Sequence, residues 1–252
     1  MYNFDTVIDR KNTRCMKWDS LCESYGRDDL IPLWVADMDF PTAEPIKKAL
    51  IKRVEHNIFG YSFPSNEYYE AVIGWMKKRH NWKIEKEWIL CTPGIVPALS
   101  YAIKAFTEPG DKVILQSPVY YPFYSTIEEN GRTIVKNPLK FVDGKYYMDY
   151  EDLEKKIDSK TKMLILCSPH NPIGRVWKEE ELKKLADICI KNNIIVVSDE
   201  IHFDIVYSGN KHVVFGSISE EIMDNSIILT APSKTFNIAG LQISNIIISN
   251  EE

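Results

Sequence analysis

The stretch IIVVSDEIH spans residues 194–202. Its first four residues are apolar and β-branched, which is typical of a strand buried on both faces, and Asp199 and Glu200 come directly after Ser198 at the strand end. Burial removes water from a carboxylate, so an acid at this place needs a partner. Three interpretations are open for Asp199: a helix cap, a structural salt bridge, or a carboxylate that stabilises the positive charge of a bound group.

Strand-like runs alternate with helix-like stretches along the chain. Besides 194–198, strands are expected at 88–91, 112–116, 133–137, 163–167, 226–230 and 243–249. Helices are expected at 44–56, 66–80, 95–107, 122–130, 149–157 and 178–192, with a short turn near 216–223. This alternation predicts an α/β fold, a three-layer sandwich in which helices cover both faces of a mostly parallel seven-stranded sheet.

Composition limits the class of protein. The 252 residues are 44% hydrophobic and carry a net charge of -5 without a basic block, so no nucleic-acid partner is expected. The apolar runs are far shorter than a membrane span, and the N-terminal residues lack a signal-peptide pattern. The five cysteines form no C-x-x-C pair. We therefore expect a cytoplasmic protein with no membrane segment and no metal site.

Ligands of open α/β sheets gather at the carboxyl ends of the strands. After the first predicted strand, TPGIVP (92–97) places a glycine turn before a helix start, where free N–H groups suit a phosphate. After the fourth, SPHNPIG (168–174) holds Asn171 between two prolines, and we interpret His170 as a loop histidine. A plain structural turn is the alternative at both places.

The stretch APSKTFN (231–237) follows the sixth predicted strand and contains one lysine among uncharged residues. Burial lowers the pKa of a lysine, which makes its amine a nucleophile able to form an imine. A surface role is the default for any single lysine. Here the phosphate-type turn, the asparagine loop, the strand-end acid and Lys234 follow successive strands in this order, which favours one shared site.

With SPHNPIG, VSDEIH (197–202) and APSKTFNIAGL (231–241), the sequence resembles the fold-type I pyridoxal-5'-phosphate (PLP) enzymes of the aminotransferase superfamily over its whole length. The resemblance implies that Lys234 holds PLP as a Schiff base and that Asp199 pairs with the pyridine nitrogen. It implies that Asn171 binds the phenolic oxygen of the ring and that Tyr120 stacks on the ring. Lys234, Asp199 and Tyr120 are thus the expected catalytic residues.

The same resemblance implies further cofactor contacts and a partner. The phosphate would be bound by the N–H groups of Gly94, Ile95 and Val96 and by the hydroxyls of Ser233 and Thr230. His202 would tune the ring oxygen. Tyr61 resembles the tyrosine that reaches the partner's phosphate in the family's dimers, which implies a homodimer, although a packing role for Tyr61 is an open alternative.

Two departures from the common aminotransferase pattern and one motif indicate which group of the superfamily the sequence resembles. Gln242 stands where many members carry an arginine, and His202 stands where they often carry a tyrosine. Together with WVADMDF (34–40), these features resemble the MalY/PatB group of cystathionine β-lyases, in which this heptapeptide forms part of the substrate pocket. Trp34, Ala36 and Asn171 are therefore expected to contact the substrate.

The resemblance implies a PLP-dependent carbon–sulfur β-lyase. Its substrate would be a small amino acid, L-cystathionine or a cysteine-type thioether, and its products a thiol, pyruvate and ammonia. One alternative is a class I/II aminotransferase, which would use the same residues. A second is a regulatory protein with the PLP fold that binds a transcription factor.

The domain organisation follows from the same resemblance. Residues 1–43 lack periodicity and are expected to form an N-terminal arm that belongs with a small domain, whereas 44–252 would be the PLP-binding large domain. Family members continue with a small C-terminal domain that carries the arginine for the substrate carboxylate. We expect that domain, and that arginine, to be missing from this chain.

Overall fold

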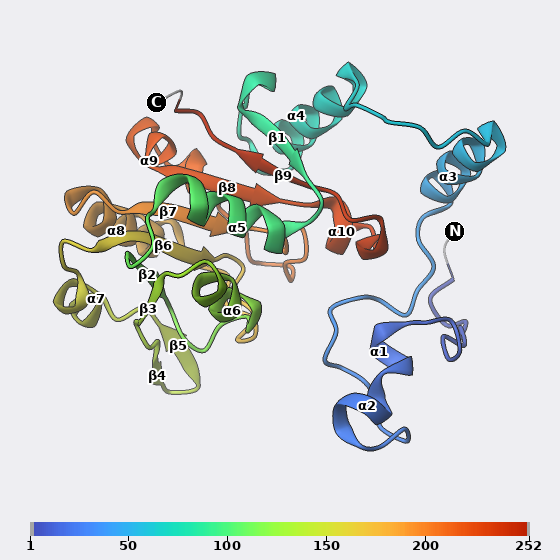
Figure 1. Cartoon of the computed structure of the whole chain (residues 1–252), viewed down its shortest axis with the longest axis horizontal. Coiled ribbons are helices and arrows are strands. Elements are labelled where there is room, and N and C mark those ends of the chain that lie inside the picture. Colours follow the sequence, from blue (N-terminus) through green and yellow to red (C-terminus); the bar gives the residue numbers. More distant parts are fainter. Residues whose placement is uncertain (1–2, 251–252) are drawn as a thin grey trace. The chain divides into compact units, whose positions relative to one another are not determined.

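One seven-stranded sheet organises the larger part of the computed structural model, which describes residues 3–250 (Figure 1). The strand order is β1-β9-β8-β7-β6-β2-β3. The strands are β1 Ile89–Thr92, β2 Lys112–Leu115, β3 Thr133–Lys136, β6 Thr161–Cys167, β7 Ile195–Asp199, β8 Ser226–Thr230 and β9 Ser244–Ile247. β3, β2, β6, β7 and β8 pair in parallel, and β9 is antiparallel to both β8 and β1. The predicted mostly parallel seven-stranded sheet is confirmed.

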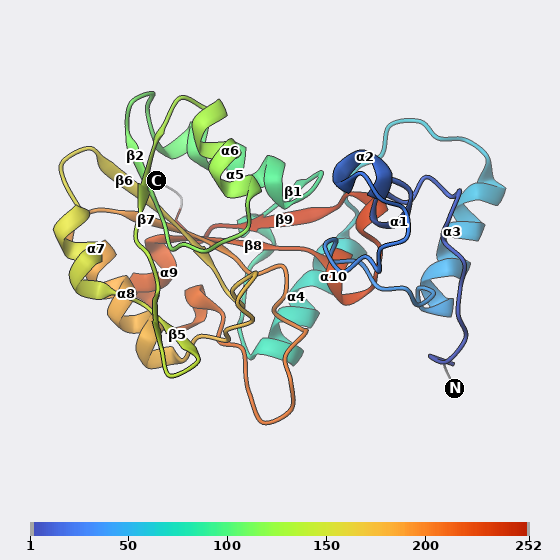
Figure 2. The ribbon, with the colours of Figure 1, turned by 90° about the horizontal axis from the view of Figure 1, so that it is seen from below.

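Helices cover both faces of this sheet, as Figure 2 shows for α5 and α6 on one side and α8 and α9 on the other. Because successive side chains of a strand point to opposite faces, the strands feed two separate cores. Met163 and Ile165 of β6 pack in the core that includes α5 and α6. Leu164 and Leu166 pack in the core that includes α8. The predicted three-layer arrangement follows from this alternation in continuous apolar strands.

The helices of this unit begin and end close to the predicted limits. They are α4 Asn66–His80, α5 Ile95–Phe106, α6 Pro122–Glu129, α7 Tyr150–Lys156, α8 Glu179–Lys191 and α9 Glu220–Asp224, with 3-10 turns at Lys86–Trp88 and Phe215–Ser217. Asparagine ends α4 in a left-handed conformation, with Asn81 at φ 55°. Within residues 3–250, no helix is both long enough and apolar enough to cross a bilayer.

A two-stranded hairpin was not predicted. β4 Lys140–Val142 pairs with β5 Lys145–Tyr147 in antiparallel fashion. Asp143 and Gly144 form the turn with φ values of 49° and 76°, the left-handed conformations that an Asp-Gly hairpin turn requires. The hairpin is largely exposed, so its strands lack the apolar pattern by which the sheet strands were recognised.

The chain divides into two compact units, each described here by itself. The larger comprises Ser62–Ala231 and the residues from Gln242 on, and the smaller comprises the residues up to Tyr61 together with Pro232–Leu241. The smaller unit contains α1 Met16–Asp19, α2 Leu21–Tyr25, α3 Glu44–His56, α10 Pro232–Thr235 and a 3-10 turn at Ala239–Leu241. The assignment of 1–43 to an arm and 44–252 to a PLP-binding domain stays a prediction.

The two-sided core makes a direct prediction about stability. Leu164 is fully buried in β6, so Leu164→Ala should lower the free energy of unfolding by about 2–5 kcal/mol through lost burial and a cavity. Leu90→Ala on β1, where the side chain is 55% exposed, serves as the control and should change it by less than about 1 kcal/mol. Urea unfolding measures both, and equal effects would contradict the assigned layers.

Candidate active site

The carboxyl ends of β1, β2, β6, β7 and β8 lie along one edge of the sheet, because these strands run in the same direction. The predicted site residues of the larger unit end these strands or follow them closely. They are Gly94, Ile95, Val96, Tyr120, Asn171, Asp199, His202 and Thr230. The structure thus brings eight predicted residues to one sheet edge, where ligands of this class of fold bind.

Asp199 is the last residue of β7 and is only 4% exposed. Its Oδ1 accepts a hydrogen bond from the Ile201 N–H at 3.1 Å, which orients the carboxylate within the turn that follows the strand. His202 lies in the same turn and is half-buried. Asp199 is therefore a buried acid at the predicted ligand edge.

Glu200 fixes the turn after Asp199 and was not predicted as a site residue. Its fully buried carboxylate accepts hydrogen bonds from the Ser198 hydroxyl and the Phe215 N–H, both at 2.9 Å. Its other oxygen lies 2.7 Å from Nε2 of His212, which is also buried. These contacts anchor the residue next to Asp199 to the segment before α9. In the sequence, the two adjacent acids Asp199 and Glu200 were the signal that could have identified the buried Glu200–His212 pair.

Tyr120 is held in the loop between β2 and α6. Its ring meets the Phe123 ring edge-on at 5.7 Å between centroids, and Phe123 is fully buried in the core. Burial, the neighbouring Tyr121 and the charge of Asp199 raise the pKa of Tyr120. Tyr120 is therefore within electrostatic reach of Asp199, whereas Tyr121 is 69% exposed. This difference supports the choice of Tyr120 over its neighbour.

The loop of Asn171 is tied to the loop of Tyr120 through His170. His170 is 1% exposed, and its Nε2 lies 2.9 Å from the Pro118 carbonyl oxygen. Burial lowers the pKa of His170 to about 4, so the neutral ring donates through Nε2. The Asn171 N–H donates to the Cys167 sulfur at 3.3 Å. His170 thus supports the loop that presents Asn171, in agreement with its interpretation as a loop histidine.

The turn before α5 has a backbone that only glycine adopts readily. Gly94 has φ 123° and is the N-cap residue, so it brings no side chain to the start of α5. The Gly94 N–H donates to the Ser244 hydroxyl at 3.1 Å, and that hydroxyl lies 2.6 Å from the Thr92 hydroxyl. Ser244 of β9 was missed by sequence reasoning, because its partner Thr92 is 152 residues away.

Thr230 ends β8 and is 2% exposed. Its hydroxyl lies 3.5 Å from the side-chain nitrogen of Asn245, whose oxygen accepts a 2.6 Å hydrogen bond from the Tyr68 hydroxyl. Burial and the nearby Cys91 raise the pKa of Tyr68, so the phenol keeps its proton. Thr230 is therefore oriented by side chains of β9 and α4.

Lys234, Ser233, Trp34, Ala36 and Tyr61 belong to the smaller unit. Lys234 lies in α10, four residues after Thr230 in sequence, and its Nζ donates to the Ala36 carbonyl oxygen at 2.9 Å. The side chain is half-buried, not fully enclosed. Ser233 is buried, and Tyr61 is fully exposed. The structure therefore joins two predicted residues, Lys234 and Ala36, by a direct hydrogen bond.

Trp34 contacts the N-terminal segment. Its Nε1 donates to the Lys17 carbonyl oxygen at 3.2 Å, and its ring packs edge-on against Tyr25 at 5.5 Å between centroids. These contacts position the start of WVADMDF. They leave its predicted substrate role untested.

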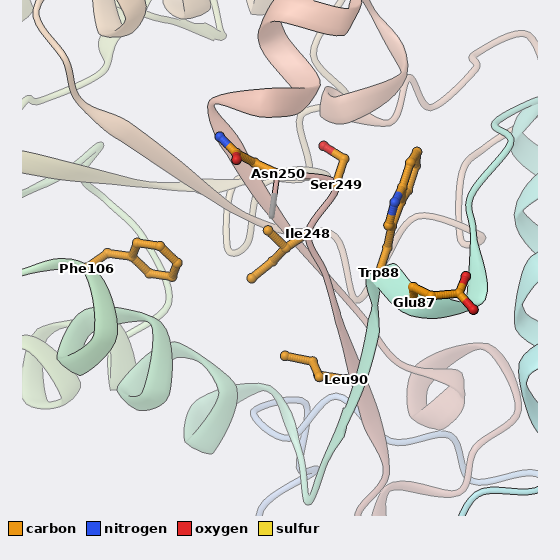
Figure 3. A pocket seen from close by; sticks show the side chains of 7 residues that line it. All are labelled: Glu87, Trp88, Leu90, Phe106, Ile248, Ser249 and Asn250. Carbon is orange, nitrogen blue, oxygen red and sulfur yellow. The ribbon is translucent and has the colours of Figure 1, made fainter. Parts of the chain in front are cut away.

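A surface pocket of the larger unit lies away from these residues (Figure 3). It is lined by Glu87, Trp88, Leu90, Phe106, Ile248, Ser249 and Asn250. Glu87 and Trp88 precede β1 and the last three residues follow β9, so the pocket reaches toward the edge opposite the carboxyl ends. It shares no residue with the candidate site.

Comparison with known proteins agrees with this arrangement. Residues 28–252 match the family described as aminotransferase class I and II. The chain is 52% identical over 247 residues to cystathionine beta-lyase PatB of Bacillus subtilis (strain 168), covering 98% of this chain and 64% of PatB. The chain thus spans less than two thirds of the length of this relative.

Solved structures give the same result. Cystalysin from Treponema denticola, which contains a pyridoxal 5'-phosphate cofactor, matches with a TM-score of 0.95 and 46% identity over 100% of this chain and 64% of its own. The PLP-bound C-S lyase from Staphylococcus hominis matches with a TM-score of 0.93 and 40% identity, again over 100% and 64%. The fold is that of the PLP-dependent transferases. The chain belongs to the aminotransferase class I and II family.

The buried His170 predicts a pH-dependent stability. Its pKa is about 4 in the folded chain against 6.5 in an unfolded one, so only the unfolded chain gains this proton as the pH falls between these values. The free energy of unfolding should therefore fall toward acid by up to about 3 kcal/mol from this residue alone. His170→Gln keeps a donor but cannot titrate.

Urea unfolding of both proteins between pH 7 and pH 4 tests this. The stability of the parent relative to His170→Gln should decline as the pH falls through about 6.5. A difference that stays constant with pH would show that His170 takes up its proton equally in both states.

Proposed function

We propose that this chain carries the cofactor half of a PLP-dependent carbon–sulfur β-lyase. The enzyme cleaves L-cystathionine or a cysteine-type thioether to a thiol, pyruvate and ammonia. The observation that carries the proposal is Asp199, a 4% exposed carboxylate at the carboxyl end of β7, on the edge that also carries Tyr120 and the Asn171 loop. A buried acid in that position suits a protonated pyridine nitrogen.

The residues of the larger unit fit the phosphate end of PLP. The start of α5 presents the N–H groups of Ile95 and Val96, and an anion at a helix N-terminus is stabilised by these groups and by the helix dipole. Gly94 leaves the approach free of a side chain, while its own N–H is engaged by Ser244. Ile95 and Val96 are therefore the better phosphate donors, with Thr230 as a hydroxyl contact. The hydroxyl of Ser233, which belongs to the smaller unit, is expected from the family resemblance to add a second.

Each residue has a distinct chemical task. PLP, when bound, withdraws electrons from the α-carbon of the attached amino acid. Asp199 keeps the pyridine nitrogen protonated through its negative charge. The Lys234 amine removes the proton from Cα as a general base, and the electron pair left at Cα expels the thiolate from Cβ. Tyr120 would stack on the ring, while Asn171 and His202 would bind its phenolic oxygen.

The amine of Lys234 is prepared for this task by its contact with Ala36. A carbonyl acceptor 2.9 Å from Nζ holds the long, flexible side chain in one direction. Trp34 and Ala36 lie in the heptapeptide that we expect to contact the substrate. The same segment would thus serve the substrate and the catalytic amine.

The proposed enzyme is a cytoplasmic homodimer. Helix α3 has no buried residue among those described, and Leu50, Ile51 and Val54 form an exposed apolar stripe at helical spacing. Ile58 and Phe59, which follow the helix, are more than 60% exposed. Together with the fully exposed Tyr61, they make a surface suited to a second copy of the chain.

The lyase proposal is tested by product release and by covalent cofactor binding. Lys234→Ala should abolish borohydride-stable attachment of PLP at this position, detected by peptide mass spectrometry. Asp199→Asn should keep the attachment but lower pyruvate release from L-cystathionine by roughly 10²–10⁴-fold, because the electron sink weakens. Tyr121→Phe is the matched control and should retain activity.

The acceptor requirement separates a lyase from an aminotransferase. Pyruvate and thiol should appear from L-cystathionine without any added keto acid. Strict dependence on a keto-acid acceptor would identify a transaminase that uses the same residues, and would overturn the lyase assignment while leaving PLP binding intact.

The dimer is tested by sedimentation. Val54→Asp places a charge in the α3 stripe and should shift the chain toward monomer, since burying an unpaired carboxylate is costly. Lys52→Asp on the same helix changes the charge more strongly but lies outside the stripe, so it should leave the association state unchanged. Monomeric parent protein at micromolar concentration would refute the homodimer.

A further inference from the structure

Segment 36–40 of the smaller unit lies along residues 232–241, which comprise α10 and the 3-10 turn after it. We call residues 232–241 the Lys234 loop. The Ala36 carbonyl accepts from Lys234 Nζ at 2.9 Å. The side-chain oxygen of Asn237 accepts from the Met38 N–H at 3.0 Å, and its nitrogen donates to the carbonyls of Met38 and Phe40 at 3.0 and 2.8 Å. Asn237 therefore satisfies three main-chain groups of a segment that has no helix or strand of its own.

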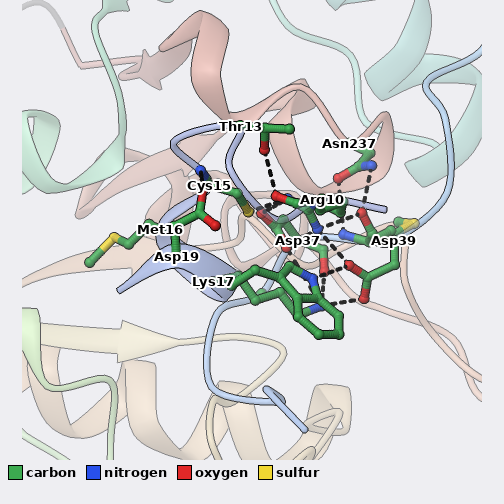
Figure 4. Close-up of polar contacts among 12 residues, drawn as sticks. Arg10, Thr13, Cys15, Met16, Lys17, Asp19, Asp37, Asp39 and Asn237 are labelled. Atoms are coloured by element: carbon green, nitrogen blue, oxygen red, sulfur yellow. Dashed lines mark hydrogen bonds and ion pairs between the residues drawn. The ribbon is translucent and has the colours of Figure 1, made fainter. Parts of the chain in front are cut away.

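Two basic side chains from elsewhere in the unit, Arg10 and Lys17, hold this segment through its two acids (Figure 4). The Arg10 guanidinium donates hydrogen bonds to both carboxylate oxygens of Asp37, at 3.0 and 2.8 Å, and to Asp39 at 2.7 Å. Lys17 binds Asp39 at 2.6 Å and the Asp37 carbonyl at 3.1 Å. We call Arg10, Lys17, Asp37 and Asp39 the Arg10 cluster.

The charges of the Arg10 cluster balance and are partly shielded from water. Lys17 is 5% exposed, which is tolerable for an ammonium only when carboxylates accompany it. The hydrogen bond from Arg10 lowers the pKa of Asp37. Burial acts to raise the pKa of Asp39, but hydrogen bonds from Lys17, Trp18 and Arg10 lower it to about 2. Asp37 and Asp39 thus stay ionised near neutral pH.

The two sets of contacts alternate along the segment. Ala36, Met38 and Phe40 bond to the Lys234 loop through main-chain atoms, whereas the side chains of Asp37 and Asp39 bind Arg10 and Lys17. Arg10 and Lys17 also donate to the Met38 and Asp37 carbonyls. A further hydrogen bond to the Lys234 loop, from the Thr42 hydroxyl to the Phe236 carbonyl at 2.9 Å, follows just after the segment. Any displacement of the acids would therefore shift the groups that contact Lys234 and Asn237.

We propose that the Arg10 cluster positions Lys234. By fixing segment 36–40, it fixes the Ala36 carbonyl that accepts from the Lys234 amine, and so restricts the orientations from which that amine can attack the PLP aldehyde. In that step Nζ bonds the aldehyde carbon, and the aldehyde oxygen leaves as water. Arg10 and Lys17 touch no reacting atom and are positioning residues. This inference rests on the proposed role of Lys234.

The test compares two ion pairs of the same unit. Arg10→Met removes the guanidinium of the cluster at similar side-chain length, and should slow covalent attachment of PLP to Lys234 roughly tenfold or more, because small misplacements of a reacting group cost this much. The control, Arg27→Met, removes the Arg27–Asp29 pair, in which both side chains are 63% exposed, and should attach PLP at the parent rate. Timed borohydride reduction and the mass of the Lys234 peptide give these rates.

A readout without cofactor distinguishes positioning from a general loss of fold. In Arg10→Met, amide hydrogen exchange should rise in peptides covering 34–40 and 232–241 but not in peptides from β6 and β7. Arg10→Lys keeps the positive charge but loses the bidentate hydrogen bonds to Asp37, so it should attach PLP faster than Arg10→Met and more slowly than the parent. A rise in exchange throughout the larger unit would count against the proposal.

A double-substitution cycle completes the test and keeps it decisive if Arg10→Met fails to fold. Asn237→Ala cuts the link between segment 36–40 and the lysine loop. Its effect on the attachment rate should not multiply with that of Arg10→Met, because both substitutions act through one segment. If Arg10→Met does not fold, Arg10→Lys takes its place in the cycle. Independent effects, or a parent-like rate in the Arg10 variants, would overturn the proposal. Failure of the parent chain to attach PLP at Lys234 would instead overturn the proposed function.

Discussion

Parallel pairing of β6, β7 and β8 in a sheet buried on both faces is the constraint on which the larger unit depends. It requires apolar residues at consecutive positions, since each strand feeds two cores. It also brings the carboxyl ends of β6, β7 and β8 to the same edge, where ligands of open α/β sheets bind. Asp199 is where these demands meet, because it is the last residue of β7 and carries a buried carboxylate at that edge.

Much of this arrangement could be predicted from the sequence. Continuous β-branched runs locate the sheet strands, and the strand predicted at 226–230 and the helices predicted at 44–56 and 66–80 have the observed limits. The strand predicted at 194–198 begins and ends one residue later, at Ile195 and Asp199. The β4–β5 hairpin was missed because its exposed strands lack the apolar pattern, although its Asp-Gly turn was a readable signal.

The supporting contacts of the site could not be predicted in the same way. The Gly94 turn was visible as a glycine before a helix, but Ser244, which holds it, comes from a strand far along the chain. The acids of WVADMDF were visible, yet their partner Arg10 is 27 residues from Asp37, and Lys234 is 198 residues from Ala36. Local patterns identify groups that carry chemistry, whereas three-dimensional packing decides which residues hold them.

The alternation within segment 36–40 has a consequence for which changes of its length the structure tolerates. Ala36, Met38 and Phe40 contact the Lys234 loop through main-chain atoms, so these hydrogen bonds do not depend on their side chains. Asp37 and Asp39 contact Arg10 and Lys17 mainly through their carboxylates, and the Asp37 carbonyl also accepts from Lys17. Inserting or deleting one residue would exchange the two sets at once and disconnect the lysine loop from its support. The length of this segment is therefore a stricter structural requirement than most of its composition.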